Sequence, residues 1–294
     1  MSRLRSAIEA GEFAVTSEVG PPKGTDVSHM LETAESLRGR VHALNVTDNQ
    51  AAVMRLSTLA ACIHLKMHGF EPVLQVTCRD RNRLGLQSDL LGAASFGIRN
   101  VLALTGDHVV VGDHPEAKAV FDLESVQLLE TIARLNAGTD LAGNELKGTP
   151  DFFAGAVVTP DANPQRPQLA KFEKKVRAGA HYFQTQAAYD AQHFREFMGY
   201  AHELGAKVLV GIVVLRSAGM ARFMNANIPG ISVPTRIIDK LAASSDPVET
   251  GIEIAAAFVN EVRDVCDGVH IMAVGAEHLV PRVLDALELE AVSA

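Results

Sequence analysis

The chain has very few of the residues that build disulfide, metal or iron–sulfur frameworks. It holds 3 cysteines in 294 residues, Cys62, Cys78 and Cys266, together with 3 tyrosines and no tryptophan. Three scattered cysteines are too few for a disulfide scaffold, a zinc site or an iron–sulfur cluster held by this chain alone. Each is therefore expected to be a small buried apolar residue.

Long apolar runs and runs of basic residues are also missing. No uncharged apolar stretch is long enough to span a membrane, and residues 1–15 have no apolar segment typical of a signal peptide. Acidic residues outnumber basic ones by 35 to 27, for a net charge of -8. We therefore expect a cytoplasmic protein whose partner is a small organic ligand, without a membrane span and without nucleic acid.

Apolar runs rich in β-branched residues alternate with stretches of helical period along the whole chain. The runs that predict strands are 13–20, 41–48, 71–78, 100–107, 151–159, 181–189, 207–216 and 268–274. Helices are expected over 2–10, 26–39 with Asp26 as N-cap, 54–68, 83–96, 122–136, 167–178, 191–204, a broken region from 218 to about 265, and 277–288. The loop 108–121 is long enough to suggest a function.

These strand and helix units predict a single-domain (β/α)8 TIM barrel, an α/β fold, over residues 1–294. A doubly wound open sheet is the alternative. Such sheets usually carry G-x-G-x-x-G after the first strand, whereas the turn here is VGPPKGTD, residues 19–26. Two prolines stand where the backbone has to approach a dinucleotide, so the barrel is the preferred fold.

Polar residues recur at the ends of the predicted strands, where a barrel builds its functional face. They are Glu18, Thr47, Asp48, Gln75, Thr77, Thr105, Asp107, Thr159, Gln184, Gln186 and Arg216. These ends offer no lysine for a Schiff base and no histidine pair for a metal, and His64 with His68 lack a nearby carboxylate. Amides and hydroxyls match a flat heteroaromatic ring better than a phosphate or a metal.

Glu18 and Asp107 are the two acidic candidates in this set. A carboxylate at a barrel mouth is costly unless it is paired or useful, which favours a functional role for Glu18. Asp107 follows Gly106, and a glycine there lets backbone N–H groups approach a ligand. A turn cap is the alternative interpretation of Asp107.

The chain resembles the methylenetetrahydrofolate reductase family of flavin-dependent (β/α)8 barrels, in order and over almost its whole length. SEVGPP, residues 17–22, is similar to the family's first-strand motif, which ends in a proton-donating glutamate. LTGDH, residues 104–108, is similar to its flavin-contacting fourth strand end. KKVRAGAHYFQTQAAYD, residues 174–190, is similar to its most specific stretch.

The resemblance implies that FAD is the cofactor and that 5,10-methylenetetrahydrofolate is reduced to 5-methyltetrahydrofolate. Glu18 would then be the general acid, Asp107 would lie beside flavin and pterin, and Gln186 and Gln184 would contact the folate. The flavin contacts that it implies are Thr47, Gln75, Thr105, Gly106, Asp107, Phe121 and Lys175. For Lys175 the alternative is a solvated charge on one helix with Lys171 and Lys174.

Departures from the family's pattern concern the electron donor and the adenosine half of FAD. Ala218 stands near the place where members that use NADH directly have an aromatic residue, and GVHIMAVGAE, residues 268–277, is similar to members with an iron–sulfur partner subunit. NAD(P)H and an iron–sulfur protein both stay open as donors, as do homo- and hetero-oligomers. Asn163, before Pro164, stands where the family often has histidine, and Gln168 stands where an acidic residue is common, so both depart from the pattern around the adenosine.

Two alternative functions remain at this point. One is a folate-binding barrel without flavin, similar to a methyltransferase. The other is a non-catalytic barrel subunit on which a redox partner docks.

Overall fold

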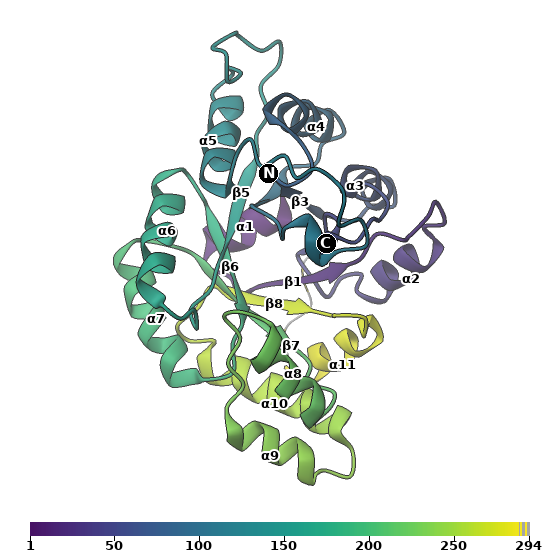
Figure 1. Ribbon diagram of the computed structural model, residues 1–294, viewed down its shortest axis with the longest axis vertical. Helices are drawn as coiled ribbons and strands as arrows, with labels where there is room; N and C mark the ends of the chain where they lie inside the picture. The colour runs from purple at the N-terminus through teal and green to yellow at the C-terminus, as the bar shows by residue number, and fades with distance from the viewer. Residues whose placement is uncertain (288, 290–291, 293–294) are drawn as a thin grey trace.

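Eight parallel strands close into a barrel in chain order, with β1 pairing to β8 (Figure 1). The computed structural model describes residues 1–287, 289 and 292. The strands are β1 Ala14–Val19, β2 Ala43–Val46, β3 Pro72–Thr77, β4 Asn100–Leu104, β5 Phe153–Val158, β6 Tyr182–Ala187, β7 Val208–Val213 and β8 Gly268–Met272. The predicted (β/α)8 barrel is confirmed, and each strand is shorter than its predicted run because the flanking residues leave the ladder for the loops.

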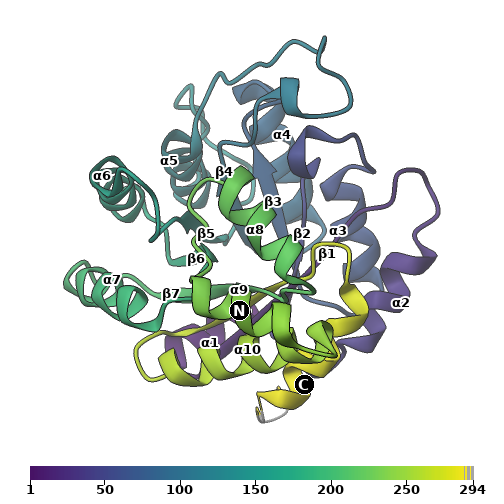
Figure 2. The ribbon, with the colours of Figure 1, turned by 60° about the horizontal axis from the view of Figure 1, so that its bottom comes forward.

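Helices surround the barrel and follow its strands. They are α1 Arg3–Ala10, α2 Ser28–Ser36, α3 Thr58–Met67, α4 Arg83–Ser95, α5 Ser125–Asn136, α6 Gln165–Arg177, α7 Ala191–Glu203, α8 Ala218–Asn227, α9 Thr235–Ala243, α10 Pro247–Val262 and α11 Val280–Ala286, with 3-10 turns η1 Gln50–Ala52, η2 Val109–Val111 and η3 Glu277–Leu279. The broken region resolves into α8, α9 and α10, which lie next to one another (Figure 2). Within the described part of the chain, no helix has the length and apolar character needed to cross a bilayer.

Several predicted helix starts are wrong: α5 begins at Ser125 instead of residue 122, α6 at Gln165 instead of 167, and α11 at Val280 instead of 277. The N-cap of α2 is Val27 instead of Asp26, whose carboxylate accepts a hydrogen bond from the Ser28 N–H at 3.0 Å just before the helix. The helix expected from residue 54 begins at Thr58. Its predicted first residue, Met54, donates its N–H to the Asp113 carboxylate at 3.0 Å, a contact from a distant loop that holds the chain outside the helix.

An apolar layer fills the amino-terminal end of the barrel, where α1 closes it. The side chains of this layer are Leu4, Ala7, Ile8, Ala14, Ala43, Val73, Leu102, Phe153, Tyr182 and Leu209. The Tyr182 ring occupies the space beside Gly155, since a Cβ on that glycine would lie 2.3 Å from the ring. The barrel interior is closely packed at this end, which leaves the interior of the opposite end for ligands.

A second and larger apolar layer lies between the strands and the surrounding helices. Cys62 and Cys78 are buried as predicted, whereas Cys266 is only partly buried. Burial raises the pKa of the Cys78 thiol to about 12 and that of Cys266 to about 11, so both are neutral thiols at physiological pH.

Backbone strain gathers at the carboxyl ends of the strands. The non-glycine residues with positive φ among those described are Asn49, Ala51, Ala52, Phe121 and Val274. All of them lie in the loops that follow β2, β4 and β8. Such conformations cost about 1 to 3 kcal/mol each and cluster at functional sites. The strain therefore marks the same face as the polar strand ends.

Candidate active site at the carboxyl ends of the strands

Glu18 is the central acidic side chain of this face. It is the next-to-last residue of β1, and its side chain is 12% exposed. Gln75 Nε2 on β3 donates to Glu18 Oε1 at 3.4 Å, and His270 Nε2 on β8 lies 3.5 Å from the same oxygen. The carboxyl group thus points into the barrel, between side chains from two other strands.

His270 lies at this site but is not among the residues predicted at the strand ends. It is 3% exposed and lies in the middle of β8, one layer below the strand ends. A signal was present in the sequence, because strand residues alternate between faces. Val269 and Ile271 belong to the outer apolar layer, so the histidine between them has to face the barrel interior.

Gln184 lies within the barrel and is 2% exposed. Its Oε1 accepts from Asn45 Nδ2 at 2.8 Å, and its Nε2 donates to Asn45 Oδ1 and to Thr16 Oγ1, both at 3.2 Å. The structure therefore brings Gln184 together with residues of β1 and β2 across the barrel interior, and its amide is satisfied by protein groups.

Gln186 is separated from Gln184 by an irregularity in β6. The register with β7 shifts between Gln184 and Ala187, and the Gly211 N–H donates to Thr185 Oγ1 at 2.8 Å. A side chain on Gly211 would overlap the Thr185 carbonyl, at 2.1 Å. Gln186 is consequently only half-buried, which leaves it accessible to a ligand.

The turn after β4 brings Gly106 close to β3. Gly106 has φ +90°, and a Cβ there would lie 2.9 Å from Thr77 Cβ. Asp107 is exposed, and its backbone carbonyl accepts from Arg79 Nη1 at 3.3 Å. Arg79 itself is 2% exposed and also bonds the Asn49 carbonyl at 3.2 Å. One buried guanidinium thus fixes the positions of two loops at this face.

Asp48 performs a structural role at the end of β2. Its carboxylate accepts from the N–H and the hydroxyl of Thr77, at 2.8 and 2.9 Å, and pairs with Arg81. The neighbouring Thr47 is buried. On the next strand end, the Thr105 hydroxyl bonds Ser125 at the start of α5.

Phe121 lies in the long loop after β4 and is half-buried with φ +40°. Its ring stacks on His108, with centroids 6.1 Å apart and planes 25° apart. A phenylalanine is rarely found in this left-handed region, which marks the loop as constrained by its contacts.

Lys175 is buried, so the interpretation as a solvated helix charge is wrong. Its ammonium donates to the Val157 carbonyl at 2.5 Å. Burial and the nearby Lys171 lower the pKa of Lys175 to about 8, and Glu124 opposes that shift. The Glu124 carboxylate forms a 2.8 Å ion pair with Lys171, so it stabilises the Lys175 ammonium less than an unpaired carboxylate would. A bound anion would favour the protonated form of this lysine.

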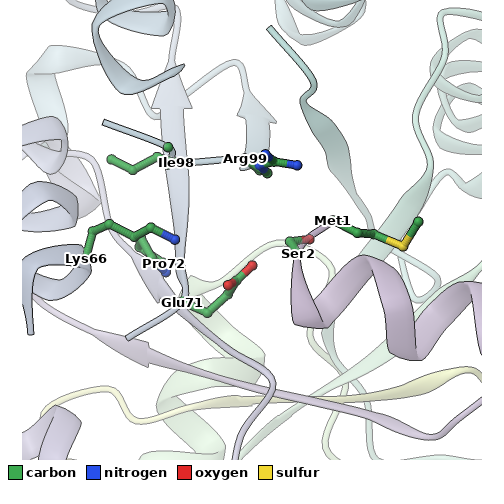
Figure 3. Close-up of a pocket in the computed structure, with 8 residues that line it drawn as sticks. Met1, Ser2, Lys66, Glu71, Pro72, Ile98 and Arg99 are labelled. Atoms are coloured by element: carbon green, nitrogen blue, oxygen red, sulfur yellow. The ribbon is translucent and has the colours of Figure 1, made fainter. Parts of the chain in front are cut away.

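A cavity of about 310 Å³ lies on the opposite, amino-terminal face of the barrel (Figure 3). Its lining residues are Met1, Ser2, Lys66, Glu71, Pro72, Gly97, Ile98 and Arg99. Asn100 donates to Glu71 at 2.9 Å and accepts from the Ser2 hydroxyl at 2.6 Å, so the polar groups beside the cavity satisfy one another. It holds none of the predicted site residues.

The fold and the site define a (β/α)8 barrel with an interior carboxyl group at a polar, strained carboxyl-end face. The family model for methylenetetrahydrofolate reductase matches residues 3–288. The chain belongs to the methylenetetrahydrofolate reductase family.

Curated relatives are distant and longer than this chain. A "Probable methylenetetrahydrofolate reductase (NADPH)" of Caenorhabditis elegans is 24% identical over 98% of this chain and 44% of its own length. "Methylenetetrahydrofolate reductase (NADH) 1" of Arabidopsis thaliana is 24% identical, over 95% of this chain and 48% of its own. The chain thus spans less than half the length of these relatives.

Solved structures share the fold at low identity. An uncharacterized protein from Clostridium thermocellum, described as binding two copies of 5-methyl-5,6,7,8-tetrahydrofolic acid, has a TM-score of 0.64 and 14% identity. The alignment covers 97% of this chain and 98% of that one. Tryptophan synthase of Mycobacterium tuberculosis follows, with a TM-score of 0.56 and 13% identity over 98% of this chain and 99% of that one.

Proposed function

We propose that this chain catalyses the flavin-dependent reduction of 5,10-methylenetetrahydrofolate to 5-methyltetrahydrofolate, with Glu18 as general acid. The observation that carries the proposal is the position of Glu18 inside the barrel, between Gln75 and His270. Family membership supports the reaction class. The electron donor is NAD(P)H or an iron–sulfur protein, and the names of the relatives already divide between NADPH and NADH.

Several features of the carboxyl-end face fit FAD. Gly106 lets the turn pack closely against Thr77, and without a side chain it exposes its backbone to close approach by a ligand. Lys175 is a buried cation whose lowered pKa an anionic diphosphate would restore. The remaining groups proposed to contact the cofactor are Thr47, Gln75, Thr105, Asp107 and Phe121. When bound, reduced FAD supplies the hydride.

The chain's own residues would manage the proton and the orientation of the folate. Glu18 delivers a proton to the nitrogen that leaves the methylene bridge, a contribution of typically about 10² to 10⁴ in rate. Gln75 Nε2 then donates to the carboxylate that remains. Asp107 favours the cationic form of the opened folate, and Gln186 holds the pterin by hydrogen bonds.

The affinity for FAD is expected to fall as the pH rises through about 8. Lys175 is protonated below its pKa of about 8 and neutral above it, so its attraction for a diphosphate is present at low pH and lost at high pH. Because binding is linked to one proton, the affinity for FAD can fall by up to about tenfold per pH unit. Fluorescence titrations of FAD from pH 6.5 to 9.5 measure this dependence. Lys175→Met should bind FAD more weakly and show no such decline; a wild-type affinity that is flat across this range would contradict the role of Lys175.

The reaction is tested without knowledge of the physiological donor. Protein loaded with FAD is reduced with dithionite under anaerobic conditions and mixed with 5,10-methylenetetrahydrofolate. The absorbance of oxidised flavin should return, with one 5-methyltetrahydrofolate formed per flavin. Folate binding by a protein that retains no FAD would favour the flavin-free alternative. Binding of neither would favour the non-catalytic subunit.

A further inference from the structure

A series of side-chain hydrogen bonds runs through the interior of the barrel to His270, whose Nε2 lies 3.5 Å from Glu18 Oε1. It begins with the reciprocal amide pair of Asn45 and Gln184, continues from Gln184 Nε2 to Thr16 Oγ1 at 3.2 Å, and reaches His270 Nδ1 at 2.9 Å from Thr16 Oγ1. The four residues are at most 3% exposed. Such a buried, connected network fixes the orientation of its members.

The donors and acceptors in this series of side chains determine the direction of each hydrogen bond. Thr16 Oγ1 accepts from Gln184, and its single proton is free to be donated. The available acceptors are His270 Nδ1 at 2.9 Å and the Val269 carbonyl at 3.4 Å, and the shorter contact is the stronger one. Donation along the shorter contact makes His270 Nδ1 the acceptor of a hydrogen bond from Thr16, whereas donation to the Val269 carbonyl would leave an Nδ1–H to donate to Thr16.

An imidazole that accepts at Nδ1 carries its proton on Nε2 when it is neutral. His270 Nε2 is the ring nitrogen that faces Glu18 Oε1, at 3.5 Å. Glu18 is the charged side chain in contact with the histidine, and the other members of the chain are neutral amides and a hydroxyl. In this tautomer the ring presents an N–H, and not a lone pair, to the carboxyl group.

We propose that Asn45, Gln184 and Thr16 form a positioning relay that selects the Nε2–H tautomer of His270. The Nε2–H of this tautomer stabilises the Glu18 carboxylate after Glu18 has transferred its proton. This catalytic role rests on the proposed function. Gln184 then acts through Thr16 and His270 and does not contact the folate. The opposite tautomer would direct a lone pair at the carboxylate and oppose proton transfer.

The relay is tested with two substitutions at Thr16. Thr16→Val keeps the shape of the side chain but removes the hydroxyl, whereas Thr16→Ser retains it. We expect Thr16→Val to lower the rate constant of folate-dependent flavin reoxidation about tenfold with little change in the folate KM, a fraction of what a general acid supplies. Thr16→Ser should restore the rate toward that of the wild type. Equal rates for the two variants would overturn the relay.

The tautomer itself is measured by ¹⁵N NMR of the histidine rings, with His270→Asn to assign the signal. In the wild-type protein, Nδ1 of His270 should show the ¹⁵N chemical shift of an unprotonated acceptor nitrogen and Nε2 that of a protonated one. A protonated Nδ1 overturns the proposal whether or not Thr16→Val folds. If the wild type shows the expected tautomer but no folate-dependent reoxidation, the proposed function fails while the relay stands.

Discussion

Glu18→Gln is expected to slow folate-dependent reoxidation of the flavin by about 10²- to 10³-fold. The amide has no proton of suitable acidity to give to the leaving nitrogen, and loss of a general acid costs a factor within the range of about 10² to 10⁴. Anaerobic stopped-flow mixing of reduced enzyme with 5,10-methylenetetrahydrofolate measures the effect directly.

The same substitution should leave the architecture of the site in place. A glutamine Oε1 still accepts from Gln75 Nε2 and still faces His270 Nε2, the two contacts that the carboxyl oxygen makes now. FAD affinity and reduction by dithionite should therefore stay close to wild type.

Glu12→Gln is the matched control for this variant. Glu12 is exposed and lies just before β1, at the amino-terminal end of that strand. Its substitution by glutamine therefore removes the same charge, but far from the carboxyl-end face. Its reoxidation rate should equal that of the wild type. A Glu18→Gln protein that reoxidises as fast as the control would remove Glu18 from the mechanism.

The barrel was predictable because its signal is local and repeated. Each strand is a short apolar run, and each following helix shows the helical repeat of apolar residues. An error at one boundary therefore leaves the number and the order of the units unchanged. The error at Asp26 arises from a local hydrogen bond with the Ser28 N–H, whereas the error at Met54 arises where a contact between loops replaces a helical hydrogen bond. Asp113 binds both the Met54 N–H and Lys23, which join three loops that are far apart in the sequence.

The site could be predicted only in part, because some of its residues lie below the strand ends, inside the barrel. Strand ends can be found from the sequence, and Glu18 and Gln75 do meet there. His270 lies one layer lower, where the sequence shows only a histidine within an apolar strand. The position of Gln186 relative to Gln184 depends on the shift in β6 after Gln184, where the backbone comes close to Gly211 on β7. That contact is tertiary and leaves no local pattern.

Gly106→Ala is expected to disturb both stability and flavin binding. The residue has φ +90°, and the added Cβ would lie 2.9 Å from Thr77 Cβ, so the alanine meets backbone strain and overlap together. The strain costs about 1 to 3 kcal/mol and overpacking a further 1 to 3 kcal/mol. Displacement of the turn also moves Asp107, and we expect FAD affinity to fall by at least about tenfold, since one lost charged or close contact is worth roughly 1.4 kcal/mol or more.

Gly143→Ala separates the effect of backbone strain from the effect of overlap with Thr77. Gly143 has φ +91°, almost the same as Gly106, but nothing lies within 4 Å of its added Cβ. It should lose only the free energy of the strained backbone, about 1 to 3 kcal/mol, with FAD affinity unchanged. Chemical denaturation of the two variants gives the difference in the free energy of unfolding, and fluorescence titration gives the FAD affinities. Because the backbone strain is common to both, the excess in Gly106→Ala measures the packing of the turn against Thr77. Identical stability and affinity in the two proteins would show that this turn neither packs tightly nor carries the cofactor.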